Sequence, residues 1–258
     1  MPAIDTSAQV AGAFSGVGAW QRATVASVTV ETYRAKTFRV ALSDWSDFRS
    51  GQHVDVKLTA PDGYQAQRSY SIASSPELLG SIDLTVELVE GGEVSSWFHD
   101  VAEPGDVFEL RGPIGGPFTW TVDDGGPLLL VGGGSGVVPL MSMLRHHRAH
   151  DSAAPALLLY SSRTLDDVIY LNELESYAST DSGPTVSLTL TRQNPPGWTG
   201  YTRRIDQRMI DDLLDEVGEP TLVFICGPTA FVENAAGLCV AAGVSAERIR
   251  TERFGPSG

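Results

Sequence analysis

Apolar and polar residues alternate in short runs between Trp20 and about Trp120, and Gly, Pro and Asp separate these runs. A period of two predicts strands with one buried face, and frequent turn residues favour an antiparallel barrel or sandwich. One helix is expected in this half, over residues 94–100. The expected strands are residues 24–30, 36–42, 53–58, 69–73, 82–88 and 106–110.

The pattern changes after the acidic and glycine-rich residues 123–126. Continuous apolar runs there alternate with longer stretches of helical periodicity, which predicts a parallel sheet with crossover connections. We therefore expect two domains, over residues 20–122 and 123–258, preceded by a flexible tail over residues 1–19. The expected strands are residues 128–131, 156–160, 186–191 and 221–225, and the expected helices are residues 138–148, 165–177, 206–216 and 230–242.

The chain is acidic, with 18 Lys and Arg against 32 Asp and Glu and a net charge of −14. Nucleic acid binds clustered Lys and Arg, and an anionic membrane surface repels a chain of this charge, so neither is an expected partner. No run of 18 apolar residues occurs. The first 18 residues have the features of neither a secretory signal nor a transit peptide, so we expect a cytoplasmic protein.

Metal chemistry is not expected. Cys226 and Cys239 are the only cysteines, which are too few for an iron–sulfur cluster, and they form no Cys/His set for structural zinc. His146, His147 and His150 fall at the end of an expected helix. Solvated side chains beside the helix dipole are the simpler interpretation of these histidines.

Two motifs in the first half have the chemistry that a flavin dinucleotide needs. In Arg68-Ser69-Tyr70-Ser71 the Tyr offers a flat face, the last Ser a small hydroxyl and the Arg a fork for phosphate. Residues 91–96, Gly-Gly-Glu-Val-Ser-Ser, open the expected helix, and a helix N-terminus after glycines is an anion site. Taken singly, the first motif is also compatible with one alternating strand, and the second with an ordinary capped helix.

Three further motifs follow. Residues 111–118, Arg-Gly-Pro-Ile-Gly-Gly-Pro-Phe, predict an irregular loop. Residues 131–139, Val-Gly-Gly-Gly-Ser-Gly-Val-Val-Pro, join an expected strand to an expected helix, as a dinucleotide-phosphate loop does, although Pro139 replaces the third Gly of the usual pattern. Cys226-Gly227-Pro228 follows a strand, where ligands collect in open α/β sheets. Plain turns, and a buried core Cys226, are the alternatives.

In sequence order these five motifs resemble the ferredoxin–NADP reductase family. Glu252-Arg253-Phe254 is also similar to the family's terminal acid–x–aromatic ending, although four residues follow it here. The resemblance covers about residues 20–255. It implies a six-stranded antiparallel β-barrel that binds FAD, followed by an α/β parallel-sheet domain that binds NADPH or NADH.

The resemblance also implies roles for individual residues. Ser71 is expected beside the flavin N5, and Cys226 and Glu252 beside the nicotinamide, as the catalytic residues. The expected FAD contacts are Arg68 at the phosphate, Tyr70 and Phe254 stacked on the flavin, and Ser69, Ser71, Val86, Glu87, Leu88, Gly92, Val94 and Ser95. The expected nicotinamide nucleotide contacts are Gly133, Gly134, Ser135, Gly136, Pro139, Ser161, Arg163, Cys226, Gly227 and Pro228.

The residues after the second strand of the second domain favour NADPH over NADH. A Rossmann-like NAD site has an acid just after this strand. This chain has Ser161-Ser162-Arg163 there, and two hydroxyls and a cation suit a 2′-phosphate. Asp166 and Asp167 are close, but Thr164 and Asp167 approximate a capping box for the next helix.

The favoured function is an NAD(P)H-dependent reductase that passes hydride to FAD and then single electrons to a separate protein, such as a ferredoxin, flavodoxin or oxygenase component. A free-flavin or ferric-chelate reductase, and a non-catalytic electron-relay or nucleotide-binding subunit, are the alternatives. An acidic protein partner needs a local basic patch for docking. The candidates for this patch are Arg22, Arg34, Lys36, Arg39 and Arg49. The alternative is that these residues are scattered surface charges.

Overall fold

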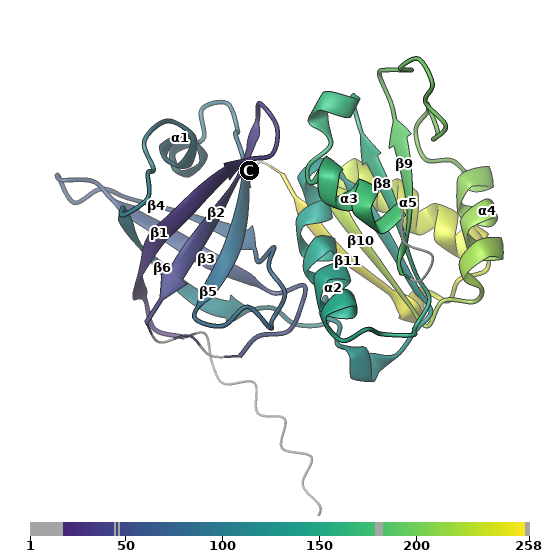
Figure 1. Ribbon diagram of the computed structural model, residues 1–258, viewed down its shortest axis with the longest axis horizontal. Helices are drawn as coiled ribbons and strands as arrows, with labels where there is room; N and C mark the ends of the chain where they lie inside the picture. Colours follow the sequence, from purple (N-terminus) through teal and green to yellow (C-terminus); the bar gives the residue numbers. More distant parts are fainter. Residues whose placement is uncertain (1–17, 44, 46, 179–182, 256–258) are drawn as a thin grey trace, which may run out of the picture.

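The computed structural model describes residues 18–43, 45, 47–178 and 183–255. The predicted flexible tail over residues 1–19 lies outside the described residues except for its last two. Two sheets that share no strand lie side by side (Figure 1). The first is built from the N-terminal half of the chain and the second from the C-terminal half. Within the described residues, no helix is long and apolar enough to cross a membrane.

The first domain is a six-stranded antiparallel sheet with the order β4-β3-β6-β1-β2-β5, as expected. An isolated bridge between Ile72 and Leu84 joins the end of β4 to β5, so the sheet curls into a barrel. Helix α1 (Glu93–Asp100) packs Phe98 into its core. The strands are β1 (Gln21–Val30), β2 (Ala35–Leu42), β3 (His53–Thr59), β4 (Gln65–Ser71), β5 (Ser81–Glu87) and β6 (Val107–Ile114).

Strand β6 extends further than its sequence indicates. Residues 111–114 were expected to begin an irregular loop, but they continue the pairing with β3, with a bulge between His53 and Asp55. The side chains support this pairing, because Arg111 donates to Asp55 at 2.9–3.0 Å. The loop prediction was therefore wrong for these four residues. Gly and Pro near the end of a strand need not end its pairing, because a β-bulge can accommodate the irregular residues.

The second domain is a five-stranded parallel sheet with the order β11-β10-β7-β8-β9. Helices α2 and α3 cover one face, and α4 and α5 cover the other (Figure 1). The strands are β7 (Leu128–Gly133), β8 (Ala156–Ser162), β9 (Thr185–Leu190), β10 (Leu222–Pro228) and β11 (Ile249–Phe254). The helices are α2 (Val137–Ala149), α3 (Leu171–Ala178), α4 (Gln207–Val217) and α5 (Thr229–Ala241), with short 3₁₀ turns η1 (Val122–Asp124), η2 (Gly134–Gly136), η3 (Leu165–Asp167) and η4 (Ala246–Arg248).

One predicted helix is divided. Residues 165–177 form the 3₁₀ turn η3 and then α3, and between them Tyr170 has a φ of 63°. A non-glycine residue in this left-handed region interrupts a right-handed helix. The buried hydroxyl of Tyr170 hydrogen-bonds Thr85 on β5 of the barrel. This contact also explains why β5 is buried on both faces, since its outer face lies against the second domain.

Polar contacts join the middle of α2 to the segment that follows β4. Ser142 Oγ donates to the carbonyl of Ser74 at 2.7 Å, and Arg145 donates to the carbonyl of Ala73 at 2.7 Å. Arg145 also ion-pairs with Glu173 on α3. The hydrogen bonds of Ser142 and Arg145 therefore tie the second domain to the barrel.

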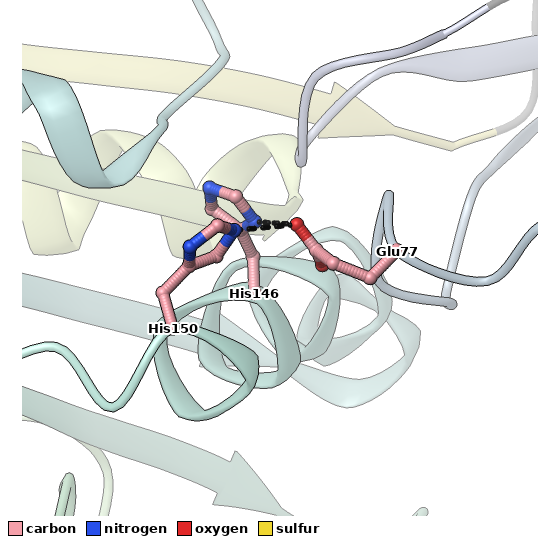
Figure 2. Close-up of side chains that lie close together, drawn as sticks. All are labelled: Glu77, His146 and His150. Carbon is pink, nitrogen blue, oxygen red and sulfur yellow. Dashed lines mark hydrogen bonds and ion pairs between the residues drawn. The ribbon is translucent and has the colours of Figure 1, made fainter.

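His146 of α2 and His150, the residue that follows this helix, share the carboxylate of Glu77 in this interface (Figure 2). His146 Nδ1 and His150 Nε2 lie 2.7 and 2.8 Å from Glu77 Oε1. The backbone N–H of Val122 donates to His146 Nε2 at 3.3 Å, so the His146 proton lies on Nδ1 and is donated to Glu77. Because Nδ1 carries this proton, the contact between His146 and Glu77 is a hydrogen bond that joins the two domains.

The expectation of solvated histidines is wrong for His146 and His147. Both side chains are buried, and Trp120 packs against each ring. His147 Nε2 also hydrogen-bonds the carbonyl of Ala154 at 2.7 Å. Among these three histidines, only His150 is exposed.

Candidate active site

A cavity of about 300 Å³ lies between the two domains. The second domain contributes the carboxyl ends of its parallel strands and the loops that follow them, where ligands bind in open α/β sheets. The barrel contributes the β1–β2 turn and the end of β5. The cavity is lined by Thr32, Arg34, Ala35, Glu87, Gly133, Gly134, Ser135, Ser161, Ser162, Arg163, Asp167, Ile169, Thr191, Pro228, Phe231 and Phe254.

The glycine-rich loop after β7 divides into two parts. Gly133, Gly134 and Ser135 line the cavity, as predicted for a nucleotide loop. Gly136 lies against β10 instead, because a Cβ atom there would come within 2.2 Å of the Cys226 carbonyl oxygen. Pro139 is buried in the first turn of α2 and is not among the cavity residues. The structure therefore brings only the first part of the predicted motif to the cavity.

Strand β8 ends at the same cavity. Ser161 and Arg163 line it, together with Thr191 from the end of the neighbouring strand β9. Thr164 Oγ1 donates to Asp167 Oδ2 at 2.6 Å, but the Thr164 side chain caps no backbone N–H of the 3₁₀ turn that follows, so the capping-box interpretation is wrong. Asp167 also lines the cavity, so both a cation and an acid face it on this side.

Cys226 and Glu252 are directly opposite each other on β10 and β11. Cys226 is 2% exposed and does not line the cavity, and burial together with the Glu252 charge raises the pKa of its thiol. Burial raises the pKa of Glu252 to about 7. Its Oε2 atom is buried without a hydrogen-bond partner in the described structure.

His53 joins this pair from the barrel. Its Nδ1 lies 3.8 Å from Glu252 Oε1, and burial lowers the pKa of the imidazole, which favours its neutral form. His53 is also directly opposite Ser71 on the β3–β4 ladder. Strand pairing therefore places Cys226 beside Glu252 and Ser71 beside His53, and the contact between His53 and Glu252 joins the two domains here. Sequence reasoning missed His53.

The four residues of the predicted FAD motif on β4 differ in their burial and in their hydrogen bonds. Tyr70 is packed edge-on against Phe98 at 5.7 Å between ring centroids, and burial raises the pKa of its phenol. Arg68 is exposed, with Nη1 donating to the Gln67 carbonyl. Ser69 Oγ is bonded to Asp55 at 2.6 Å, so its hydroxyl is engaged within the barrel. Ser71 lies at the end of the strand, half-buried.

The N-terminus of α1 is open, as an anion site requires. Gly92 is its N-cap and no side chain caps its first-turn N–H groups. Val94 is buried, and Ser95 Oγ hydrogen-bonds the Gly92 carbonyl at 3.1 Å. A Cβ atom on Gly92 would come within 2.6 Å of Ser95 Oγ, so glycine leaves room for the Ser95 hydroxyl in this position. This cradle fits the pyrophosphate of a flavin dinucleotide.

The predicted contacts at the end of β5 have partners inside the protein. The Val86 carbonyl lies 2.9 Å from His99 Nε2, and the Leu88 N–H donates to the Arg34 carbonyl at 2.7 Å. Glu87 lies between them and lines the cavity. At the opposite wall Phe254 is 36% exposed at the end of β11, and Pro228 lies beside it on β10, whereas Gly227 is packed under the ring of Phe231.

A curled antiparallel barrel with an open helix N-terminus, joined to a parallel sheet with a glycine loop, defines a two-domain flavin and nucleotide oxidoreductase. Residues 22–119 match the family model for the oxidoreductase FAD-binding domain, and residues 130–237 match that for the oxidoreductase NAD-binding domain. Over 213 residues the chain is 36% identical to ferredoxin–NADP reductase B of Sorangium cellulosum (strain So ce56), covering 80% of this chain and 85% of that protein. The chain belongs to the ferredoxin–NADP reductase family.

Two further proteins are similar. The glycine betaine monooxygenase reductase subunit of Pseudomonas aeruginosa (strain UCBPP-PA14) is 32% identical over 211 residues, and the match covers 81% of this chain and 57% of that protein. The solved structure of Amycolatopsis cytochrome P450 reductase is 26% identical with a TM-score of 0.78, and the match covers 93% of this chain and 72% of that one. The predicted family, the two-domain fold and the FAD and nicotinamide cofactors are thus confirmed.

Proposed function

We propose that this chain is an NAD(P)H-dependent reductase that uses FAD to deliver single electrons to a separate protein. The cavity between the domains carries this proposal, because it places the glycine loop and the end of β8 opposite the barrel, beside Phe254. When bound, FAD accepts a hydride and releases electrons one at a time. The protein's part is to hold both cofactors in contact and to exclude water.

Different residues would hold the two cofactors. Gly92, Val94 and Ser95 would present the N–H groups of α1 to the FAD pyrophosphate, and Arg68, which is exposed at the surface, would bind phosphate. Tyr70 and Phe254 would enclose the flavin. On the other side, Gly133, Gly134 and Ser135 would bind the nicotinamide nucleotide beside Ser161 and Arg163, and Cys226, Gly227 and Pro228 would form the nicotinamide end.

Glu252, with His53 beside it, would bind and release a proton at the proposed reacting centre. A carboxyl group with a pKa near 7 exchanges a proton readily at neutral pH. Its unpartnered Oε2 is available to hold that proton, and His53 Nδ1 lies 3.8 Å from the other oxygen of this carboxylate. Ser71, Glu252 and Cys226 are therefore proposed as the residues that position the reacting groups, with His53 added to them.

The electron acceptor is proposed to be an oxygenase component, a ferredoxin or a flavodoxin. Two proteins similar to this chain are named as a glycine betaine monooxygenase reductase subunit and a cytochrome P450 reductase. Within the chain, Cys226 and Cys239 are both buried and too few to hold an iron–sulfur cluster. The chain spans 57% of the length of the glycine betaine monooxygenase subunit, so the partner is a matter for experiment.

The proposed docking surface is smaller than the sequence suggested. Lys36 donates to the His99 carbonyl at 2.7 Å, Arg39 ion-pairs with Asp83, and Arg49 ion-pairs with Asp124. Arg34 faces the cavity. Any steering by the remaining positive charge should weaken with salt, because exposed charges are screened beyond about 8 Å at physiological ionic strength.

Steady-state reduction of ferricyanide and of candidate partners tests the function. The purified chain should reduce ferricyanide with NADPH or NADH, and should reduce one of the three partner classes faster than it reduces free flavin. Faster reduction of free flavin would favour a flavin reductase. No turnover with ferricyanide would leave only a non-catalytic role. NADPH is the proposed donor, because Arg163 and Ser161 face the cavity where a 2′-phosphate would lie.

A further inference from the structure

The turn between β1 and β2 is held rigidly at the edge of the cavity. Thr32 is buried, and its Oγ1 accepts hydrogen bonds from the backbone N–H groups of Arg34 and Ala35, at 3.1 and 3.0 Å. The N–H groups of Glu31 and Thr32 both donate to the Ala35 carbonyl. This bonding fixes the backbone from which the Arg34 side chain projects.

The guanidinium of Arg34 is anchored but not neutralised. Its Nη2 donates to the Leu88 carbonyl at 2.9 Å, and in the described part of the chain this is its one hydrogen bond. The Leu88 N–H donates back to the Arg34 carbonyl, so the turn and the residue after β5 hold each other. The side chain lines the cavity and has no carboxylate partner among the described residues, although the chain as a whole carries a net charge of −14.

The glycine loop of the other domain lines the same cavity as this guanidinium. Strand β5 contacts η2, and Gly133, Gly134 and Ser135 line the same cavity as Arg34. Backbone N–H groups of such a loop bind phosphate oxygens from one side. A half-buried arginine opposite them supplies the charge that a bridging diphosphate would need from the other side.

We propose that Arg34, a residue of the barrel domain, binds the pyrophosphate of the nicotinamide nucleotide and holds the two domains closed on it. This inference rests on the proposed function. Arg163 is the other cation of the cavity, but it follows β8, next to β7 in the sheet, where the adenosine end would lie. Because NADH and NADPH share the pyrophosphate, Arg34 should serve both donors equally, whereas Arg163 should serve only NADPH.

Calorimetric titration of the FAD-loaded protein with ADP-ribose tests this directly, since ADP-ribose contains the pyrophosphate and lacks the nicotinamide. Arg34→Gln should weaken binding roughly 10- to 100-fold, the range for a hydrogen bond to a charged group. Arg34→Lys should recover part of the loss. Arg208→Gln is the matched control, because Arg208 is 84% exposed on α4, and it should bind like the wild type.

Kinetics with ferricyanide separates the remaining possibilities. Arg34→Gln should raise KM for NADPH and NADH by the same factor with the flavin retained. Unchanged ADP-ribose affinity would overturn the proposal, and so would loss of FAD, which would assign Arg34 to the flavin. A rise in KM confined to NADPH would also overturn it by moving Arg34 to the 2′-phosphate. Failure of the proposed function is distinct, because the wild-type protein would then show no NAD(P)H-dependent turnover.

Discussion

Glu252→Gln should change the pH dependence of stability in a way that the structure fixes in sign. Burial raises the pKa of this carboxyl from 4.5 to about 7. Between these values the folded protein holds a proton that the unfolded chain has lost, so the free energy of unfolding falls as pH rises. At 1.36 kcal/mol for each pKa unit, the effect is at most about 3 kcal/mol at pH 8. Glutamine is neutral at both ends of this range and should remove the loss.

Urea unfolding of the FAD-loaded protein at pH 5 and pH 8 measures this effect. The variant should gain stability over the wild type at pH 8 by roughly 1–3 kcal/mol and gain much less at pH 5. Glu247→Gln is the matched control, because Glu247 is an exposed acid just before β11, and its substitution should have the same small effect at both pH values. An equal gain from Glu252→Gln at both pH values would refute the reasoning, since it would show that Glu252 ionises normally.

Three further predictions concern the cofactors. Heat-released flavin should be FAD at one per chain, and Arg68→Ala should weaken its retention by roughly 1.5–3 kcal/mol in a flavin-release titration; FMN or undiminished retention would contradict this. Cys226→Ala should keep its flavin, but NADPH should bleach the flavin absorbance more slowly in stopped flow. An unchanged rate would indicate that Cys226 is only a buried core residue. The ratio of kcat/KM for NADPH to that for NADH should exceed one and fall in Arg163→Ala, and a tenfold wild-type preference for NADH would defeat it.

Most of the fold follows from local patterns. Period-two alternation marks the barrel strands, and continuous apolar runs such as residues 128–131 mark parallel strands buried on both faces. Strand β11 escaped prediction because Arg250, Glu252 and Arg253 give it no apolar run. Its partly exposed position at the edge of the sheet accepts those side chains, so hydrophobicity does not reveal it.

The site was predictable where its chemistry lies in one contiguous motif. Gly133, Gly134 and Ser135 needed only the strand–glycine–helix order. His53 and Arg34 were not recognised because their meaning depends on how the domains meet. His53 gains its place from Glu252 at the far end of the chain, and Arg34 resembled any surface cation until the barrel turn was seen at the cavity. Tyr170 likewise breaks a helix whose sequence alone favours continuity.

The central claim is that one chain brings a nicotinamide nucleotide and FAD into reacting contact across the cavity between its domains. Anaerobic addition of NADPH or NADH to the purified, FAD-loaded protein tests it most directly, with the visible absorbance of the bound flavin as the readout. We predict that the visible absorbance of the oxidised flavin is lost after the nucleotide is mixed in and returns when ferricyanide is added. Persistence of the oxidised flavin spectrum with both nucleotides in excess would contradict the account.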